Sequence, residues 1–184
     1  MEKKKVLLLI DIQQEYVSEG RPFFISTISP SLKNAKKVLE TARAESWEIL
    51  HVQHLQDGAI FHPDSQYSNF IPGFEPKNNE FIFTKENFSC FSDLMFANHM
   101  ESLIDYEIFV IGYGSTMCCM ATIIDGYHRG FRFTFVQDAS HSKRSAQFSE
   151  VVRHIHAVDQ LRTFANITNT ADISVTIGKF ENEK

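Results

Sequence analysis

Three side chains that could together perform covalent chemistry each follow an apolar segment of the chain. Asp11 comes directly after the run VLLLI, Lys85 directly after EFIFT, and Cys118 a few residues after EIFVIG. A thiolate can attack a carbonyl carbon, and a carboxylate can move the proton that this attack releases. A nearby ammonium and a helix N-terminus both favour the thiolate, so a lowered pKa is expected for Cys118. The combination predicts nucleophilic catalysis by a cysteine.

Each of these residues also has a purely structural interpretation. Asp11 could form a turn or cap a helix, Lys85 could be a solvated strand end, and Cys118 could be a small buried residue. Their placement at the ends of three strand candidates favours the functional interpretation, because independent structural residues have no reason to share one edge of a sheet.

The hydrophobic pattern predicts the elements that must position these residues. Residues 5–10 are almost continuously apolar, as expected of a strand covered on both faces. The other expected strands are 47–53, 80–84, 107–112, 131–137 and one near 164–167; the expected helices are 30–45 with Ser29 as N-cap, one within 93–104, 117–128 and 145–163. This alternation predicts an α/β fold, a three-layer α/β/α arrangement with a mainly parallel, roughly six-stranded Rossmann-like sheet. Ligands of such sheets bind beyond the carboxyl ends of the strands.

Length and charge narrow the class of protein. The 184 residues fit one domain, residues 1–184, and the net charge of −5 gives no reason to expect nucleic acid or an acidic membrane as partner. The first apolar run ends at Ile10, well short of the roughly 7–15 residues of a secretory signal or the about 20 of a membrane span. Three cysteines, two of them adjacent, make no disulfide framework. We therefore expect a cytoplasmic protein without a membrane partner.

Four motifs resemble those of the isochorismatase-like cysteine hydrolases, the superfamily of nicotinamidases and N-carbamoylsarcosine amidases. DIQQEY, from Asp11, is similar to the family's D-x-Q-x-x-[FY], and KENFSCF, from Lys85, to its K-x-x-F-S-A-F. GYGSTMCCMAT, from Gly112, resembles G-x-x-T-x-x-C-V-x-x-T, and the later HRGFRFTFVQDASHS places Asp138 on the family's aspartate. Cys90 stands where the family commonly has alanine. The four motifs are collinear, which makes the resemblance specific.

The resemblance implies a role for each residue of the triad. Cys118 would attack an amide-type carbonyl, Asp11 would act as acid and base, and Lys85 would stabilise the charged forms. The register at the two cysteines favours Cys118 as nucleophile, although a shift by one residue would select Cys119. The backbone N–H groups of Ser115 and Cys118 would form the oxyanion hole, beside a cis peptide bond at Gly114–Ser115.

The resemblance also concerns the substrate and the absence of a metal. The chain lacks the D-x-H metal motif of the family's nicotinamidases, and His51 and His54 point to opposite faces of a strand, so neither metal nor cofactor is expected. True isochorismatases lack the nucleophilic cysteine, so its presence favours hydrolysis of a C–N bond in a small amide, ureide or carbamoyl compound. The candidate substrate contacts are Gln13, Tyr16, His54, Phe88, Phe91 and Tyr113.

Two other functions are also consistent with the sequence. The chain could instead be a catalytically silent binding or scaffold member of the same fold, or a redox protein using the adjacent cysteines.

The family analogy predicts a homo-oligomer, with His141, His154 and His156 at the surface or an interface. The long segment 55–80 should cover the crevice, and Phe61, Phe70 and Phe74 within it are candidates for an aromatic pocket wall.

Overall fold

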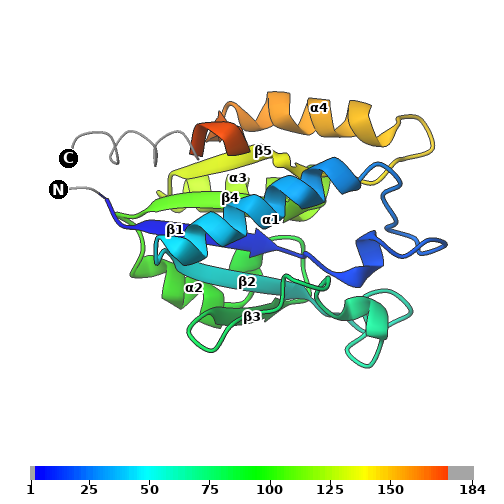
Figure 1. Ribbon diagram of the computed structural model, residues 1–184, viewed down its shortest axis with the longest axis horizontal. Coiled ribbons are helices and arrows are strands. Elements are labelled where there is room, and N and C mark those ends of the chain that lie inside the picture. Colours follow the sequence, from blue (N-terminus) through cyan, green and yellow to red (C-terminus); the bar gives the residue numbers. More distant parts are fainter. Residues whose placement is uncertain (1–2, 174–184) are drawn as a thin grey trace.

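The computed structural model describes residues 3–173 and contains one parallel sheet of six strands in the order β3-β2-β1-β4-β5-β6 (Figure 1). The predicted α/β class is therefore confirmed. The strands are β1 (Lys5–Ile10), β2 (Glu48–His54), β3 (Phe81–Lys85), β4 (Glu107–Tyr113), β5 (Phe133–His141) and β6 (Ala165–Thr168).

Helices cover both faces of this sheet. Helix α1 (Ser29–Ala44) packs on one face, in front of β1 and β4 in Figure 1. The other face carries α2 (Leu94–Glu101), α3 (Met120–His128) and α4 (Glu150–Leu161). In the part of the chain that the structure describes, no helix is long and apolar enough to cross a membrane.

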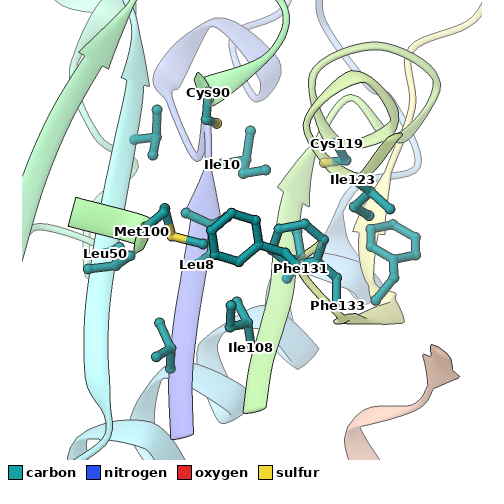
Figure 2. Close-up of a cluster of buried hydrophobic side chains, with 14 of the residues drawn as sticks. Leu8, Ile10, Leu50, Cys90, Met100, Ile108, Cys119, Ile123, Phe131 and Phe133 are labelled. Carbon is teal, nitrogen blue, oxygen red and sulfur yellow. The ribbon is translucent and has the colours of Figure 1, made fainter. Parts of the chain in front are cut away.

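The apolar run of β1 has the two-sided burial that its sequence predicts. Leu7 and Leu9 contribute to the core under α1, and Leu8 and Ile10 to the core on the opposite face. Figure 2 shows Leu8 and Ile10 among side chains of neighbouring strands and of the covering helices. The central strand is thus fixed by packing on both faces, and so is the residue that follows it.

Strand β5 differs from the expected 131–137. It begins later because the Phe131 N–H donates to the Gly126 carbonyl (2.9 Å) in the turn that ends α3. It ends later because, after an irregularity in the pairing, Ser140 still pairs with Gly112 of β4. The extension carries β5 to the same edge of the sheet as the ends of β1 and β4.

Helix α4 also begins later than expected. The hydroxyl of Ser145 accepts the N–H groups of Gln147 (3.3 Å) and Phe148 (3.0 Å), so these residues form a turn. Ser149 then caps the helix by accepting the Val152 N–H (3.3 Å). Serine side chains that bond to nearby backbone groups compete with the helix at this point.

A buried ion cluster joins α1 to the start of β3. Glu80 accepts bonds from Arg43 (2.7 and 2.9 Å), from His51 Nε2 (2.8 Å) and from the Lys77 N–H (3.0 Å). Burial alone would raise the pKa of Glu80, but the bonds from Arg43, the Lys77 N–H and His51 lower it to about 2.

Replacing Glu80 by glutamine should lower the free energy of unfolding at pH 7 by about 3 kcal/mol, because the Arg43 guanidinium would lose its carboxylate. Since the pKa of Glu80 is lowered from 4.5 to about 2 on folding, its contribution is complete above pH 4.5 and is lost as the pH falls to about 2. Urea unfolding at pH 7 and pH 3 measures both effects. Glu40→Gln, on the exposed face of α1, is the matched control. Equal losses in the two variants would contradict a stabilising role for the cluster.

Candidate active site

The first site residue, Asp11, lies directly beyond the end of β1. It is buried and has a left-handed backbone, with φ of 53°, a conformation that aspartate tolerates better than most residues. Its N–H donates to the Val52 carbonyl of β2 (2.9 Å). The left-handed turn, held by the neighbouring strand, fixes the carboxylate at the carboxyl edge of the sheet.

Lys85 ends strand β3 and connects the other members of the site. Its Nζ lies 3.0 Å from Asp11 Oδ2 and 3.3 Å from the Cys118 sulfur. It also lies 2.9 Å from His54 Nδ1. An ammonium has three N–H donors, so each has one acceptor here, and the expected convergence of acid, amine and thiol is confirmed.

A close approach of two strands permits this arrangement. Gly112 pairs with Ile10 at the ends of β4 and β1 and has a φ of +139°. A Cβ at this position would lie 2.0 Å from the Ile10 carbonyl oxygen. Glycine is therefore required where the chain leaves β4 toward Cys118.

A short π-helical turn over Ser115–Cys119 then presents the thiol. The Gly114 carbonyl accepts the N–H groups of Met117 (3.0 Å) and Cys119 (3.3 Å). This turn directs the Cys118 sulfur toward Lys85, whereas Cys119 is fully buried and lies beside Ile123, as Figure 2 shows. The geometry thus favours the register in which Cys118 is the nucleophile.

The cis peptide bond is one residue earlier than expected. The structure has it at Tyr113–Gly114, so the prediction of Gly114–Ser115 is wrong. The glycine that was expected to precede the bond instead follows it. All three cysteines of the chain, Cys90 included, are free thiols.

The electrostatics of the thiol also differ from expectation. Burial raises the pKa of Cys118 well above its usual value, the Asp11 carboxylate raises it further, and the Lys85 ammonium only partly offsets them. Burial by itself would lower the pKa of Lys85, but Asp11 and Cys118 raise it above its usual value. The expected lowering of the thiol pKa is therefore wrong, because burial of the sulfur and the nearby Asp11 carboxylate outweigh the effect of the ammonium. The raised pKa favours the protonated thiol in the resting site.

His54 is joined to the triad by its ring nitrogens. Nδ1 contacts the Lys85 ammonium, which can only donate, and Nε2 lies 2.9 Å from the Gln56 side-chain oxygen, which can only accept. Burial and Lys85 lower the pKa of His54, consistent with a neutral ring protonated at Nε2. Both nitrogens are thus engaged, so the proposed substrate contact through His54 is limited to the ring's carbon atoms.

Among residues 3–173, one group of side chains has the composition and spacing of a possible metal site, and it lies at this same place. Donor atoms of Asp11, His54 and Cys118 all lie within 4.8 Å of one another, a mixed set of the kind that zinc can use. However, the Lys85 Nζ contacts one atom of each of them. The ammonium thus occupies the position that a metal ion would need, and the residues do not fit a resident metal.

Two candidate substrate residues near β1 have different surroundings. The Gln13 amide donates to the carbonyls of His54 (3.0 Å) and Ser68 (2.7 Å) and accepts the His54 N–H (2.8 Å), so it ties the end of β2 to the following loop. The Tyr16 hydroxyl is buried and, among the described residues, has no hydrogen-bond partner, and neither has Asp11 Oδ1. Tyr16 is therefore the better candidate for a substrate contact.

The remaining aromatic candidates lie in different parts of the molecule, except that the rings of Tyr113 and Phe61 both lie against Tyr16, with ring centres 5.5 and 5.8 Å away. Phe91 lies in the core on the side of α2 and α3, and Phe88 is 56% exposed. The Tyr113 hydroxyl faces α1, 3.3 Å from Ser31 Oγ. Phe61 of the long loop lies against the site, with its ring centre 5.0 Å from that of His54.

A cavity of about 410 Å³ adjoins the end of β3. The lining of this cavity is mostly polar and contains no aromatic residue. Its lining contains Leu55, Gln56, Asp57, Pro63, Thr84, Lys85, Glu86, Asn87, Ser92 and Asp93. Gln56 connects the cavity to the triad through its bond to His54. No pattern in the sequence indicates Gln56, because its contact with His54 depends on how the loop after β2 returns to the site.

Comparisons with known proteins show the family of this chain. A family model described as the isochorismatase domain matches residues 5–172. The secreted isochorismatase effector Isc1 of Verticillium dahliae is 32% identical over 136 residues, which cover 73% of this chain and 70% of that protein. The maleamate amidohydrolase of Pseudomonas putida is 23% identical over 194 residues, with 89% of each chain covered.

The chain also resembles solved structures. An isochorismatase from Pseudomonas putida KT2440 has a TM-score of 0.84 at 26% identity, with 91% of this chain and 89% of that chain covered. The N-carbamoylsarcosine amidase of Thermoplasma acidophilum shares the fold, with a TM-score of 0.76 at 18% identity and coverage of 91% and 96%. The relatives of the chain include an amidohydrolase. The chain belongs to the isochorismatase family.

Proposed function

We propose that this isochorismatase-family hydrolase cleaves a C–N bond of a small amide, ureide or carbamoyl compound through a thioester on Cys118. The observation that carries the proposal is the simultaneous contact of the Lys85 ammonium with Asp11 and the Cys118 sulfur in a buried site. Two relatives have names that support a C–N bond as the target: the maleamate amidohydrolase of Pseudomonas putida and the N-carbamoylsarcosine amidase of Thermoplasma acidophilum.

The proposed reaction begins with proton transfer from Cys118 to Asp11. The thiolate attacks the carbonyl carbon, and the oxyanion is stabilised by the N–H groups of Ser115 and Cys118. The C–N bond then breaks, Asp11 protonates the leaving nitrogen, and ammonia or an amine departs. Asp11 next takes a proton from water, whose oxygen attacks the thioester carbonyl, and the Cys118–carbon bond breaks. Asp11 returns the proton to the sulfur, which leaves a carboxylic acid and the free thiol.

The cavity beside β3 indicates which amides suit the site. Asp57, Glu86 and Asp93 contribute carboxylates to its lining, and Lys85 is its only basic residue. The Lys85 ammonium already has three acceptors. We therefore propose that the substrate is neutral or cationic, because a carboxylate in this cavity would lack a free partner and would meet like charges.

Ammonia release from matched amides tests both proposals. Succinamide is neutral, 4-aminobutanamide is cationic and succinamate is anionic, and a ureide completes the set. The wild type should release ammonia and Cys118→Ala should not, with kcat/KM for succinamate about 3- to 10-fold below that for succinamide. The double variant Asp57→Asn, Glu86→Gln should reduce this difference, and Asp159→Asn on α4 should not. Equal turnover by wild type and Cys118→Ala would refute the mechanism, whereas a preference for succinamate would refute only the charge preference.

The homo-oligomer and the cytoplasmic location stay predictions. The same holds for a single domain over residues 1–184.

A further inference from the structure

Two consecutive residues of α4 form hydrogen bonds with the turn that carries Cys118. His154 Nδ1 lies 2.9 Å from Ser115 Oγ, and Arg153 Nη2 donates to Thr116 Oγ1 (2.9 Å). The hydrogen bonds of these two α4 residues go to the turn and to the β5 segment and not to Asp11, Lys85 or Cys118. Two neighbouring residues of one element therefore bind two neighbouring hydroxyls of the other.

The proton positions at His154 follow from its second contact. Its Nε2 lies 2.9 Å from the Gln137 carbonyl of β5, which can only accept, so Nε2 carries the hydrogen. Burial and the neighbouring His141 lower the pKa of His154 to about 4, so the ring is neutral near pH 7. Nδ1 is then an acceptor, and the Ser115 hydroxyl donates to it. His154 is half-buried and His156 is exposed, whereas His141 is buried, so the expectation of a surface or interface position is wrong for His141.

Arg153 completes the attachment on the other side of the turn. Its Nη1 donates to the Lys143 carbonyl (2.8 Å), beyond the end of β5. Thr116 Oγ1 also lies 2.6 Å from Ser142 Oγ in the same segment. The helix itself is anchored by its buried Val158 and Leu161, which pack in the core on that face of the sheet. A rigid helix thus connects the turn to the end of β5.

We propose that His154 is a positioning residue that holds Ser115 so that the N–H groups of Ser115 and Cys118 face the same point. This inference rests on the proposed function, because it assigns these two N–H groups to the oxyanion. Donors in an oxyanion hole act only when they are aligned with the charge that develops in the transition state. Loss of the His154 bond therefore lowers kcat and leaves KM nearly unchanged.

Three substitutions of His154 separate its two hydrogen bonds. Asparagine places an acceptor near the position of Nδ1 and keeps the Ser115 bond, while glutamine places a donor near that of Nε2 and keeps the Gln137 bond. Phenylalanine retains the ring and removes both. We expect kcat to fall about 10- to 100-fold in His154→Phe and His154→Gln, with KM within twofold, and to recover in His154→Asn. His156→Phe, on the exposed part of the same helix, is the matched control and should change neither constant.

A double variant and an exchange measurement complete the test. Adding His154→Phe to Ser115→Ala should cause no further loss of kcat, because the shared bond is already absent. Amide hydrogen exchange of the peptide spanning residues 113–120 should accelerate in His154→Phe and not in His154→Asn, which tests the holding role without any substrate. Unchanged kcat in His154→Phe, with Cys118→Ala inactive, would overturn the inference and leave the proposed function standing. Equal exchange in all variants would overturn it as well, and if His154→Phe does not fold, the comparison of His154→Gln with His154→Asn decides.

Discussion

The Asp11→Asn variant is expected to lose about 10³-fold in kcat and, at the same time, to react faster with iodoacetamide at Cys118. Turnover falls because asparagine cannot take the thiol proton or return it to the leaving nitrogen, a function that contributes about 10²–10⁴-fold in general acid–base catalysis. Alkylation accelerates because the Asp11 carboxylate raises the pKa of Cys118. Without that charge the pKa falls, and each unit gives about ten times more thiolate at a pH below it.

Removing the positive charge of Lys85 instead of the negative charge of Asp11 provides the control. The Lys85 ammonium lowers the pKa of Cys118, so Lys85→Met should slow alkylation and also reduce turnover. Mass spectrometry of the alkylated peptides separates Cys118 from Cys90 and Cys119, and thermal unfolding shows whether each variant is folded. Full turnover in Asp11→Asn would remove Asp11 from the mechanism, and slower alkylation would contradict the assigned electrostatics.

The second large effect is expected from Gly112→Ala, which should cost at least about 4 kcal/mol of folding free energy or prevent folding altogether. The added Cβ would lie 2.0 Å from the Ile10 carbonyl oxygen, and both backbones are fixed by the pairing of β1 with β4. No side-chain rotation can relieve a contact between backbone and Cβ. Any folded fraction would have Asp11 displaced from Cys118, so its kcat would also fall.

Gly130→Ala separates collision from backbone strain. Gly130 also has a left-handed φ, +94°, but a Cβ there would meet nothing within 4 Å. Its substitution should therefore cost only about 1–3 kcal/mol. Urea unfolding of both variants measures the difference. Similar losses would show that conformational strain, and not the close approach of two strands, makes Gly112 necessary.

The sheet and the triad could be predicted because they depend on local patterns. The apolar run before Asp11 and the strand before Lys85 fix their places in the chain, and the ends of parallel strands meet at one edge. Cys118 follows from the same rule and from the family resemblance. A sequence thus indicates which side chains converge when each of them is attached to a strand end.

What could not be predicted depends on contacts between distant segments. The direction of the Cys118 pKa shift follows from burial under loops whose paths the sequence does not reveal. The bond between His54 and Lys85 requires the register of β2 against β3, and the bond between His154 and Ser115 requires the rotation of α4 about its axis. The cis bond before Gly114 is a backbone detail that residue types alone do not determine.

The strand order has a consequence for how the chain reaches its folded state. β1 is made first, yet one of its two neighbours in the sheet is β4, which follows more than half of the chain later. During synthesis the most apolar strand therefore has only β2 to pair with until β4 has left the ribosome. Contacts between segments so distant in sequence slow folding, and unpaired apolar strands favour aggregation in the meantime. The central position that buries Asp11 thus also leaves β1 without one of its two neighbouring strands for much of the time that the protein is being made.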